Sequence, residues 1–206
     1  MLEAFLVCTG VVALAEMGDK TQLLSLCLAA RFRRPLPIAF GILVATLLNH
    51  AIAGWFGAWV GTHIPEVYLR WFLGLSFIAM AAWLLVPDKF DEDDCKVASR
   101  GTIFFTTLWL FFIAEIGDKT QVATIGLAMR YESLLAVVSG TTFGMMLANV
   151  PAVLLGDRFA KRMPATLMRR IAAGVFAVIG VLTLLGVGSS VMAPKPAATQ
   201  SGAPAP

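Results

Sequence analysis

Residues 16–22 read Glu-Met-Gly-Asp-Lys-Thr-Gln, and residues 115–121 read Glu-Ile-Gly-Asp-Lys-Thr-Gln. The two copies differ at one position, and each follows a largely apolar run, residues 4–15 in the first case and 103–114 in the second. A charge inside a membrane costs about 2.5–3.5 kcal/mol on insertion scales, so ionisable residues at that depth indicate a functional site. The sequence places charged residues after an apolar run twice, with the same charged residues in the same order.

The composition is typical of a membrane protein. Of the 206 residues, 58% are hydrophobic and 14% are charged, whereas a soluble domain carries about 25% charged residues. Several apolar runs are long enough to cross a hydrocarbon core of about 30 Å. We therefore expect an all-α membrane protein with six transmembrane helices, at approximately residues 2–30, 38–60, 69–86, 102–129, 134–155 and 171–187.

The second half of the chain repeats the first. Asn149 stands in the fifth span as Asn49 stands in the second. We expect a three-helix repeat at residues 1–86, an acidic linker at 87–101, a second three-helix repeat at 102–188 and a disordered tail at 189–206, which is rich in Ala, Pro, Ser and Gly. Because each half has an odd number of spans, the second must enter the membrane from the opposite side. Such inverted repeats are found in many secondary transporters.

The distribution of basic residues predicts the orientation. Most of the 16 lysines and arginines lie in the loops that follow the first, third and fifth spans. The positive-inside rule places these loops in the cytoplasm. We therefore predict a multi-pass protein with a cytoplasmic linker and with both termini outside the cytoplasm.

The carboxylates of the two copies suggest a cation site. We expect the first span to continue as a helix through residues 16–22, with Gly18 allowing a bend. On a helix, residues three apart share a face, so Glu16 would point the same way as Asp19, and Glu115 the same way as Asp118. If the halves pack about a pseudo-two-fold axis, the four carboxylates meet. An all-oxygen cluster suits Ca²⁺, Mg²⁺ or Mn²⁺.

Other polar residues are expected to support this cluster. The lysines of the two copies would offset part of the carboxylate charge, and hydroxyl and amide groups would add oxygen ligands. These supporting residues are Lys20, Thr21 and Gln22 in the first copy, Lys119, Thr120 and Gln121 in the second, and Asn49 and Asn149 in the neighbouring spans. The two asparagines could instead bond neighbouring helices. His50 has no counterpart, because Val150 stands in its place, and we interpret it as a packing residue.

The paired Glu-x-Gly-Asp-Lys-Thr motifs, one in each half, resemble the Gdt family of cation transporters, which includes bacterial manganese exporters and Golgi calcium/manganese transporters. The resemblance covers residues 1 to about 188. It implies a cation/proton antiporter of the cell inner membrane that exports Mn²⁺ or Ca²⁺ as its substrate and uses no cofactor. The family's motif carboxylates fall on Glu16, Asp19, Glu115 and Asp118.

Three other classes of protein remain as alternatives. An exporter of small organic cations or amino acids could use the same carboxylates as counter-charges. An intramembrane enzyme is not expected, because no Ser–His or Cys–His pair stands out and the HExxH motif is absent. An assembly factor without a substrate would tolerate neutral substitutions in both motif copies. Nothing in the sequence indicates a nucleic-acid partner, and the expected partners are a divalent cation, protons and the lipid bilayer.

Overall fold

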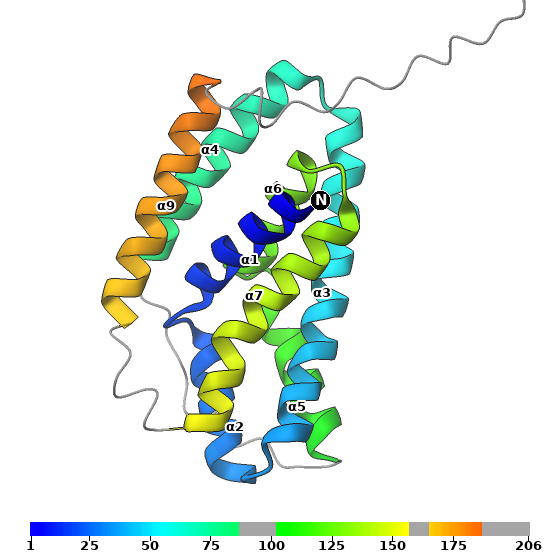
Figure 1. Cartoon of the computed structure of the whole chain (residues 1–206), viewed down its shortest axis with the longest axis vertical. Coiled ribbons are helices and arrows are strands. Elements are labelled where there is room, and N and C mark those ends of the chain that lie inside the picture. The colour runs from blue at the N-terminus through cyan, green and yellow to red at the C-terminus, as the bar shows by residue number, and fades with distance from the viewer. Residues whose placement is uncertain (87–101, 157–164, 187–206) are drawn as a thin grey trace, which may run out of the picture.

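The computed structural model describes residues 1–86, 102–156 and 165–186 (Figure 1). Over these residues the chain forms eight helices and no strand, which confirms the expected all-α class. In chain order the helices are α1 (Leu2–Glu16), α2 (Lys20–Phe32), α3 (Pro35–His63), α4 (Glu66–Leu85), α5 (Ile103–Glu115), α6 (Lys119–Arg130), α7 (Leu134–Leu155) and α9 (Ala165–Leu185). The expected linker at 87–101 and the tail at 189–206 lie outside the described residues.

Four of the described helices are long and apolar enough to cross a membrane, namely α3, α4, α7 and α9. The remaining four, α1, α2, α5 and α6, have only 12 to 15 residues each, whereas a complete span needs about 20. The first and fourth expected spans are thus each divided into two shorter helices. The expectation of a helix that continues through each motif copy is wrong.

The interruption falls at the same place in both copies. Helix α1 ends at Glu16 and α2 begins at Lys20, just as α5 ends at Glu115 and α6 begins at Lys119. Between them the chain turns at a glycine with positive φ, 82° in the first copy and 74° in the second. Glycine adopts this left-handed conformation without the Cβ clash that other residues meet. The motif glycine therefore ends one helix and lets the next start in a new direction.

The motif glutamines complete these turns. The side-chain oxygen of Gln22 accepts a hydrogen bond from the Gly18 backbone N–H at 2.9 Å. Gln121 accepts the corresponding bond from Gly117 at 2.7 Å. Each glutamine thus satisfies a backbone donor that the interrupted helix leaves without an intrahelical partner. Because no helix continues through either motif copy, helical spacing does not determine how the glutamines lie relative to the carboxylates.

Helices from opposite halves of the chain pack together. Helix α1 lies along α7, α3 contacts both α5 and α6, and α4 pairs with α9 (Figure 1). Glycines make these contacts close: a Cβ on Gly144 of α7 would lie 2.5 Å from the Thr9 oxygen of α1. Small residues at such contacts are characteristic of membrane helices. The packing brings the two motif copies to the same level inside the bundle.

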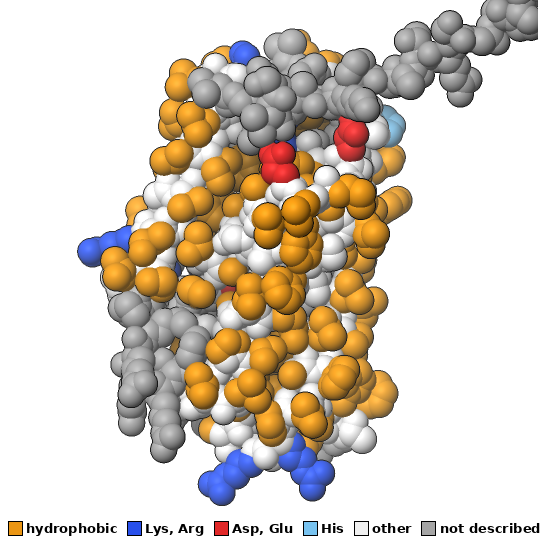
Figure 2. Space-filling view, in the orientation of Figure 1, with side chains coloured by type: hydrophobic (Ala, Val, Ile, Leu, Met, Phe, Trp, Pro, Cys, Tyr) orange, Lys and Arg blue, Asp and Glu red, His pale blue; other side chains and the backbone are white. Residues whose placement is uncertain are grey.

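The outer surface is apolar. Hydrophobic side chains cover much of the described part of the visible face (Figure 2). Asp and Glu side chains stand near its upper end, and Lys and Arg side chains stand at its lower end, where α2 turns into α3, and at its edges. The exposed large side chains include Trp55 and Trp59 on α3, Trp71 on α4 and Trp109 on α5. An apolar surface of this extent matches a lipid environment, because soluble monomers rarely expose large contiguous apolar patches.

Candidate cation site

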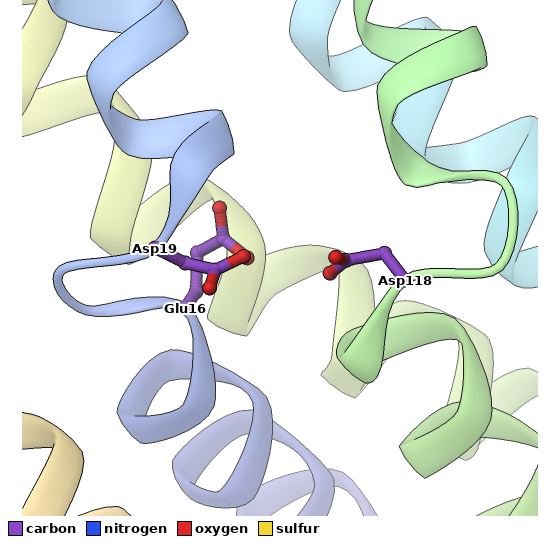
Figure 3. Close-up of side chains that lie close together, drawn as sticks. All are labelled: Glu16, Asp19 and Asp118. Carbon is purple, nitrogen blue, oxygen red and sulfur yellow. The ribbon is translucent and has the colours of Figure 1, made fainter. Parts of the chain in front are cut away.

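Three of the four motif carboxylates meet inside the bundle. One ligand oxygen from each of Glu16, Asp19 and Asp118 lies within 4.8 Å of the others, and none of the three residues is more than 2% exposed. In Figure 3, Asp118 points from the second motif copy towards Glu16 and Asp19 of the first. The two residues of the first copy converge because the chain turns between them, and not because of helical spacing.

Both aspartates stand at the start of a helix. Asp19 is the N-cap residue of α2, and Asp118 is the N-cap residue of α6. The Asp118 carboxylate accepts hydrogen bonds from the Thr120 backbone N–H at 3.4 Å and from the Thr120 hydroxyl at 3.3 Å. The positive end of a helix dipole favours a carboxylate at this position. The backbone breaks therefore help to hold negative charge in an apolar bundle.

The lysines pair across the two copies. The Lys119 ammonium lies 3.0 Å from an Asp19 oxygen, and the Lys20 ammonium lies 3.1 Å from an Asp118 oxygen. Each copy therefore supplies the lysine that neutralises the aspartate of the other. The two pairs differ in exposure, since the Lys20 side chain is 34% exposed and the Lys119 side chain is 1% exposed.

Glu115 lies outside the group of three carboxylates. Its two oxygens accept hydrogen bonds from α3, one from the Thr46 hydroxyl at 2.7 Å and one from the Asn49 amide at 3.3 Å. The Asn49 amide also donates to the Phe112 backbone oxygen at 3.0 Å. We expected four carboxylates to meet, and three of them do. The fourth, Glu115, is held apart by its hydrogen bonds to α3.

Asn149, in the second half, makes the corresponding contact with the glutamate of the first half. Its amide donates to a Glu16 oxygen at 3.1 Å and to the Met145 backbone oxygen at 3.2 Å. Each asparagine therefore binds the motif glutamate of the opposite half. Thr46 was not singled out from the sequence. Its position three residues before Asn49, on the same helical face, is the signal that could have identified it.

The remaining residues that the sequence singled out have different structural roles. Thr21 is fully buried, and its hydroxyl has no hydrogen-bond partner among the described residues. The Gln22 amide nitrogen donates to the Ala148 backbone oxygen at 3.0 Å, which ties the first turn to α7. His50 is also fully buried, and neither ring nitrogen has a hydrogen-bond partner in the described part of the chain.

Buried carboxylates at the breaks of two membrane helices are typical of secondary transporters for cations. The family model described as divalent cation/proton antiporter GDT1 matches residues 4–92 and 103–190. The chain therefore belongs to the GDT1 family of divalent cation/proton antiporters.

Individual relatives agree with this assignment. A Vibrio cholerae protein named "Putative manganese exporter" is 50% identical over 173 residues, which cover 84% of this chain and 86% of that protein. GDT1-like protein 5 of Arabidopsis thaliana is 28% identical, with 90% of this chain and 96% of that protein covered. A GDT1-like protein of Synechocystis is 26% identical, with 89% and 97% covered. No solved structure matches the chain.

Proposed function

We propose that this protein exports Mn²⁺ from the cytoplasm in exchange for protons, with Ca²⁺ as the second candidate ion. The observation that carries the proposal is the buried group formed by Glu16, Asp19 and Asp118. Hard and borderline divalent cations prefer such oxygen ligands. The choice of Mn²⁺ is supported by the name of the relative from Vibrio cholerae.

The proposed ion binds to the three carboxylates that lie together, and Glu115 acts as the fourth carboxylate of the transport cycle. Thr21 and Thr120 each follow a motif aspartate by two positions and can contribute hydroxyl oxygens. Asn49 and Asn149 orient the two glutamates through their amides. Transporters commonly bind their ions where interrupted helices leave polar backbone groups inside the membrane, and both motif copies lie at such interruptions.

In the proposed membrane arrangement, α1 and α2 together cross the bilayer as one broken span, and α5 and α6 do the same. With α3, α4, α7 and α9, this gives six spans in two inverted halves. We place the protein in the cell inner membrane, as the resemblance to bacterial manganese exporters implies. The basic loop residues place both termini outside the cytoplasm in this proposal. The motif copies then lie near the middle of the bilayer.

Proton coupling follows from the charges of the site. When the cation leaves, the carboxylates remain close together in surroundings of low dielectric constant. Asp19 and Asp118 then pair with the motif lysines, whereas Glu16 has no lysine partner among the described residues and takes up a proton in place of the departing cation. Cation and protons then compete for the same oxygens, and an inward proton gradient drives the cation outwards, provided that the empty, unprotonated site does not change sides.

The test is Mn²⁺ uptake into inside-out membrane vesicles. An acidic lumen should accelerate uptake, and a protonophore should abolish the acceleration. Glu16→Gln, Asp19→Asn, Glu115→Gln and Asp118→Asn should each lose most of the transport while membrane abundance stays near normal. Three of these changes remove one ligand charge from a desolvated site, and Glu115→Gln removes the fourth carboxylate of the proposed transport cycle. Glu3→Gln, which neutralises an exposed carboxylate on α1, is the matched control.

Two outcomes would contradict the proposal. Uptake that is indifferent to lumenal pH at a clamped membrane potential would indicate a channel or uniporter. Normal transport by any two of the four carboxylate variants would exclude the shared site. Competition by Ca²⁺ establishes the ion preference, and competition by lysine or arginine tests the organic-cation alternative.

A further inference from the structure

The two motif lysines contact two of the carboxylates that the proposed cation would bind. Asp19 and Asp118 are two of the three members of the buried carboxylate group. One oxygen of each already contacts a lysine ammonium, at 3.0 Å for Asp19 and 3.1 Å for Asp118. In the structure, therefore, each aspartate is neutralised by a positive charge from the opposite copy.

A divalent cation bound by these carboxylates would lie close to both ammonium groups. The cation and each ammonium would contact the same carboxylate, so their charges would lie only a few ångströms apart, and like charges repel strongly where water is scarce. Conversely, a buried aspartate without any positive partner is costly. The negative charge of each aspartate is therefore neutralised when either the lysine or the metal ion contacts it. When both contact it, the site carries excess positive charge.

We infer that Lys20 and Lys119 are internal competitors of the transported cation, which hold the aspartates when no metal is bound and are displaced from them when it enters. This inference rests on the proposed function, because it assumes that Glu16, Asp19 and Asp118 bind the ion. The competition lowers the affinity of the site. An exporter benefits from this because it must release the ion on the side where the ion is not needed.

The two lysines differ in how readily they can be displaced. The Lys20 side chain is 34% exposed, so its ammonium can exchange the contact with Asp118 for water. The Lys119 side chain is 1% exposed, so in this conformation its ammonium can leave Asp19 only for another buried position. Lys119 is thus the stronger competitor. Its removal should raise the affinity for the cation more than removal of Lys20.

The alternative is that the lysines only hold the aspartates in a binding geometry. It predicts the opposite sign, because a lysine that supports the ligands increases affinity and its removal decreases affinity. The direction of the change therefore distinguishes a competing lysine from a supporting one.

The experiment measures Mn²⁺ binding to the purified full-length protein in lipid nanodiscs, by competition with a fluorescent chelator. Lys119→Gln should tighten binding about tenfold, which corresponds to about 1.4 kcal/mol, and Lys20→Gln about threefold. Lys119→Arg and Lys20→Arg keep the positive charge and should not tighten binding. Arg70→Gln removes an exposed positive charge from α4, outside the cluster, and should leave the affinity as in the wild type.

The following results would contradict either the proposed competition or the proposed function. Weaker or unchanged binding in both glutamine variants overturns the competition. Loss of folding in both, with the arginine variants folded, shows that the lysines are structural and overturns it as well. Equal tightening in Arg70→Gln shows that net charge alone is responsible. A wild-type protein that binds no Mn²⁺ refutes the proposed function itself, which is a separate result.

Discussion

The hydrogen bond between Thr46 and Glu115 offers a direct test of how the halves interlock. Thr46 lies on α3 in the first half, is fully buried, and donates to Glu115 of the second half at 2.7 Å. Thr46→Val keeps the branched shape of the side chain and removes the donor. One oxygen of Glu115 then has no side-chain donor among the described residues, while the other keeps its bond from Asn49.

The expected loss can be bounded from two sides. Hydrogen bonds between membrane helices contribute about 0.6 kcal/mol on average and about 1.7 kcal/mol at most. Bonds to charged groups in proteins contribute about 1.5–3 kcal/mol. The two ranges overlap near 1.5 kcal/mol, and we take this value as the expected loss for Thr46→Val. For a chain of this size, such a loss in the free energy of unfolding lowers Tm by roughly 3–6 °C.

The assay is thermal unfolding of the purified protein in detergent, followed by the fluorescence of its five tryptophans. Two threonines provide matched controls. The Thr107 hydroxyl is equally buried but bonds within its own helix, to Ile103 at 2.8 Å, and the buried Thr142 hydroxyl has no partner among the described residues. Thr107→Val should cost less than Thr46→Val, and Thr142→Val should cost nothing. A loss in either control as large as in Thr46→Val would refute the reasoning.

Three further predictions concern glycines and topology. Gly57→Ala should destabilise the fold by about 1–3 kcal/mol, measured by the same unfolding assay, because its Cβ would lie 2.4 Å from a backbone oxygen of α6; Gly10→Ala, with nothing within 4 Å, should not. Gly117→Ala should cost about 1–2 kcal/mol through its φ of 74° alone, since the space around it is open. Single cysteines at positions 91 and 201, in a background without native cysteines, should label from opposite sides of the membrane, and labelling from the same side would exclude the inverted six-span arrangement.

The sequence was sufficient to predict the all-α class and the apolar runs that form the long helices α3, α4, α7 and α9. It also singled out the motif carboxylates, all four of which are buried in the bundle. It was not sufficient to predict that the motif interrupts the helix. Periodicity favours one continuous helix, because Gly18 alone inside an apolar run is compatible with either a helix or a turn. The local signal was nevertheless present: a glycine able to adopt positive φ is followed by an aspartate, which is a preferred N-cap residue. The hydrogen bond from Gly18 to Gln22, which completes the turn, is a side-chain contact that hydropathy does not encode.

The contacts between the two halves were even harder to predict from the sequence. Repetition of Asn49 as Asn149 predicted that the two residues would be equivalent, but not that each would bind the glutamate of the other half. The sequence likewise did not predict that Lys119 of the second copy would pair with Asp19 of the first. Such contacts depend on the register between helices that are distant in sequence, and the spacing of residues along one helix does not determine that register.

The departure from four equivalent carboxylates has a local cause in the sequence. Glu115 receives two hydrogen bonds from α3, because Thr46 and Asn49 each donate to a different oxygen. On α7, the residue three positions before Asn149 is Met146, which has no hydrogen to donate. Glu16 therefore receives only the Asn149 bond, and its second oxygen has no hydrogen-bond partner among the described residues. The difference between Thr46 and Met146 thus matches the difference between the two glutamates. The glutamate with two side-chain donors lies apart from the aspartates, and the glutamate with one donor lies with them.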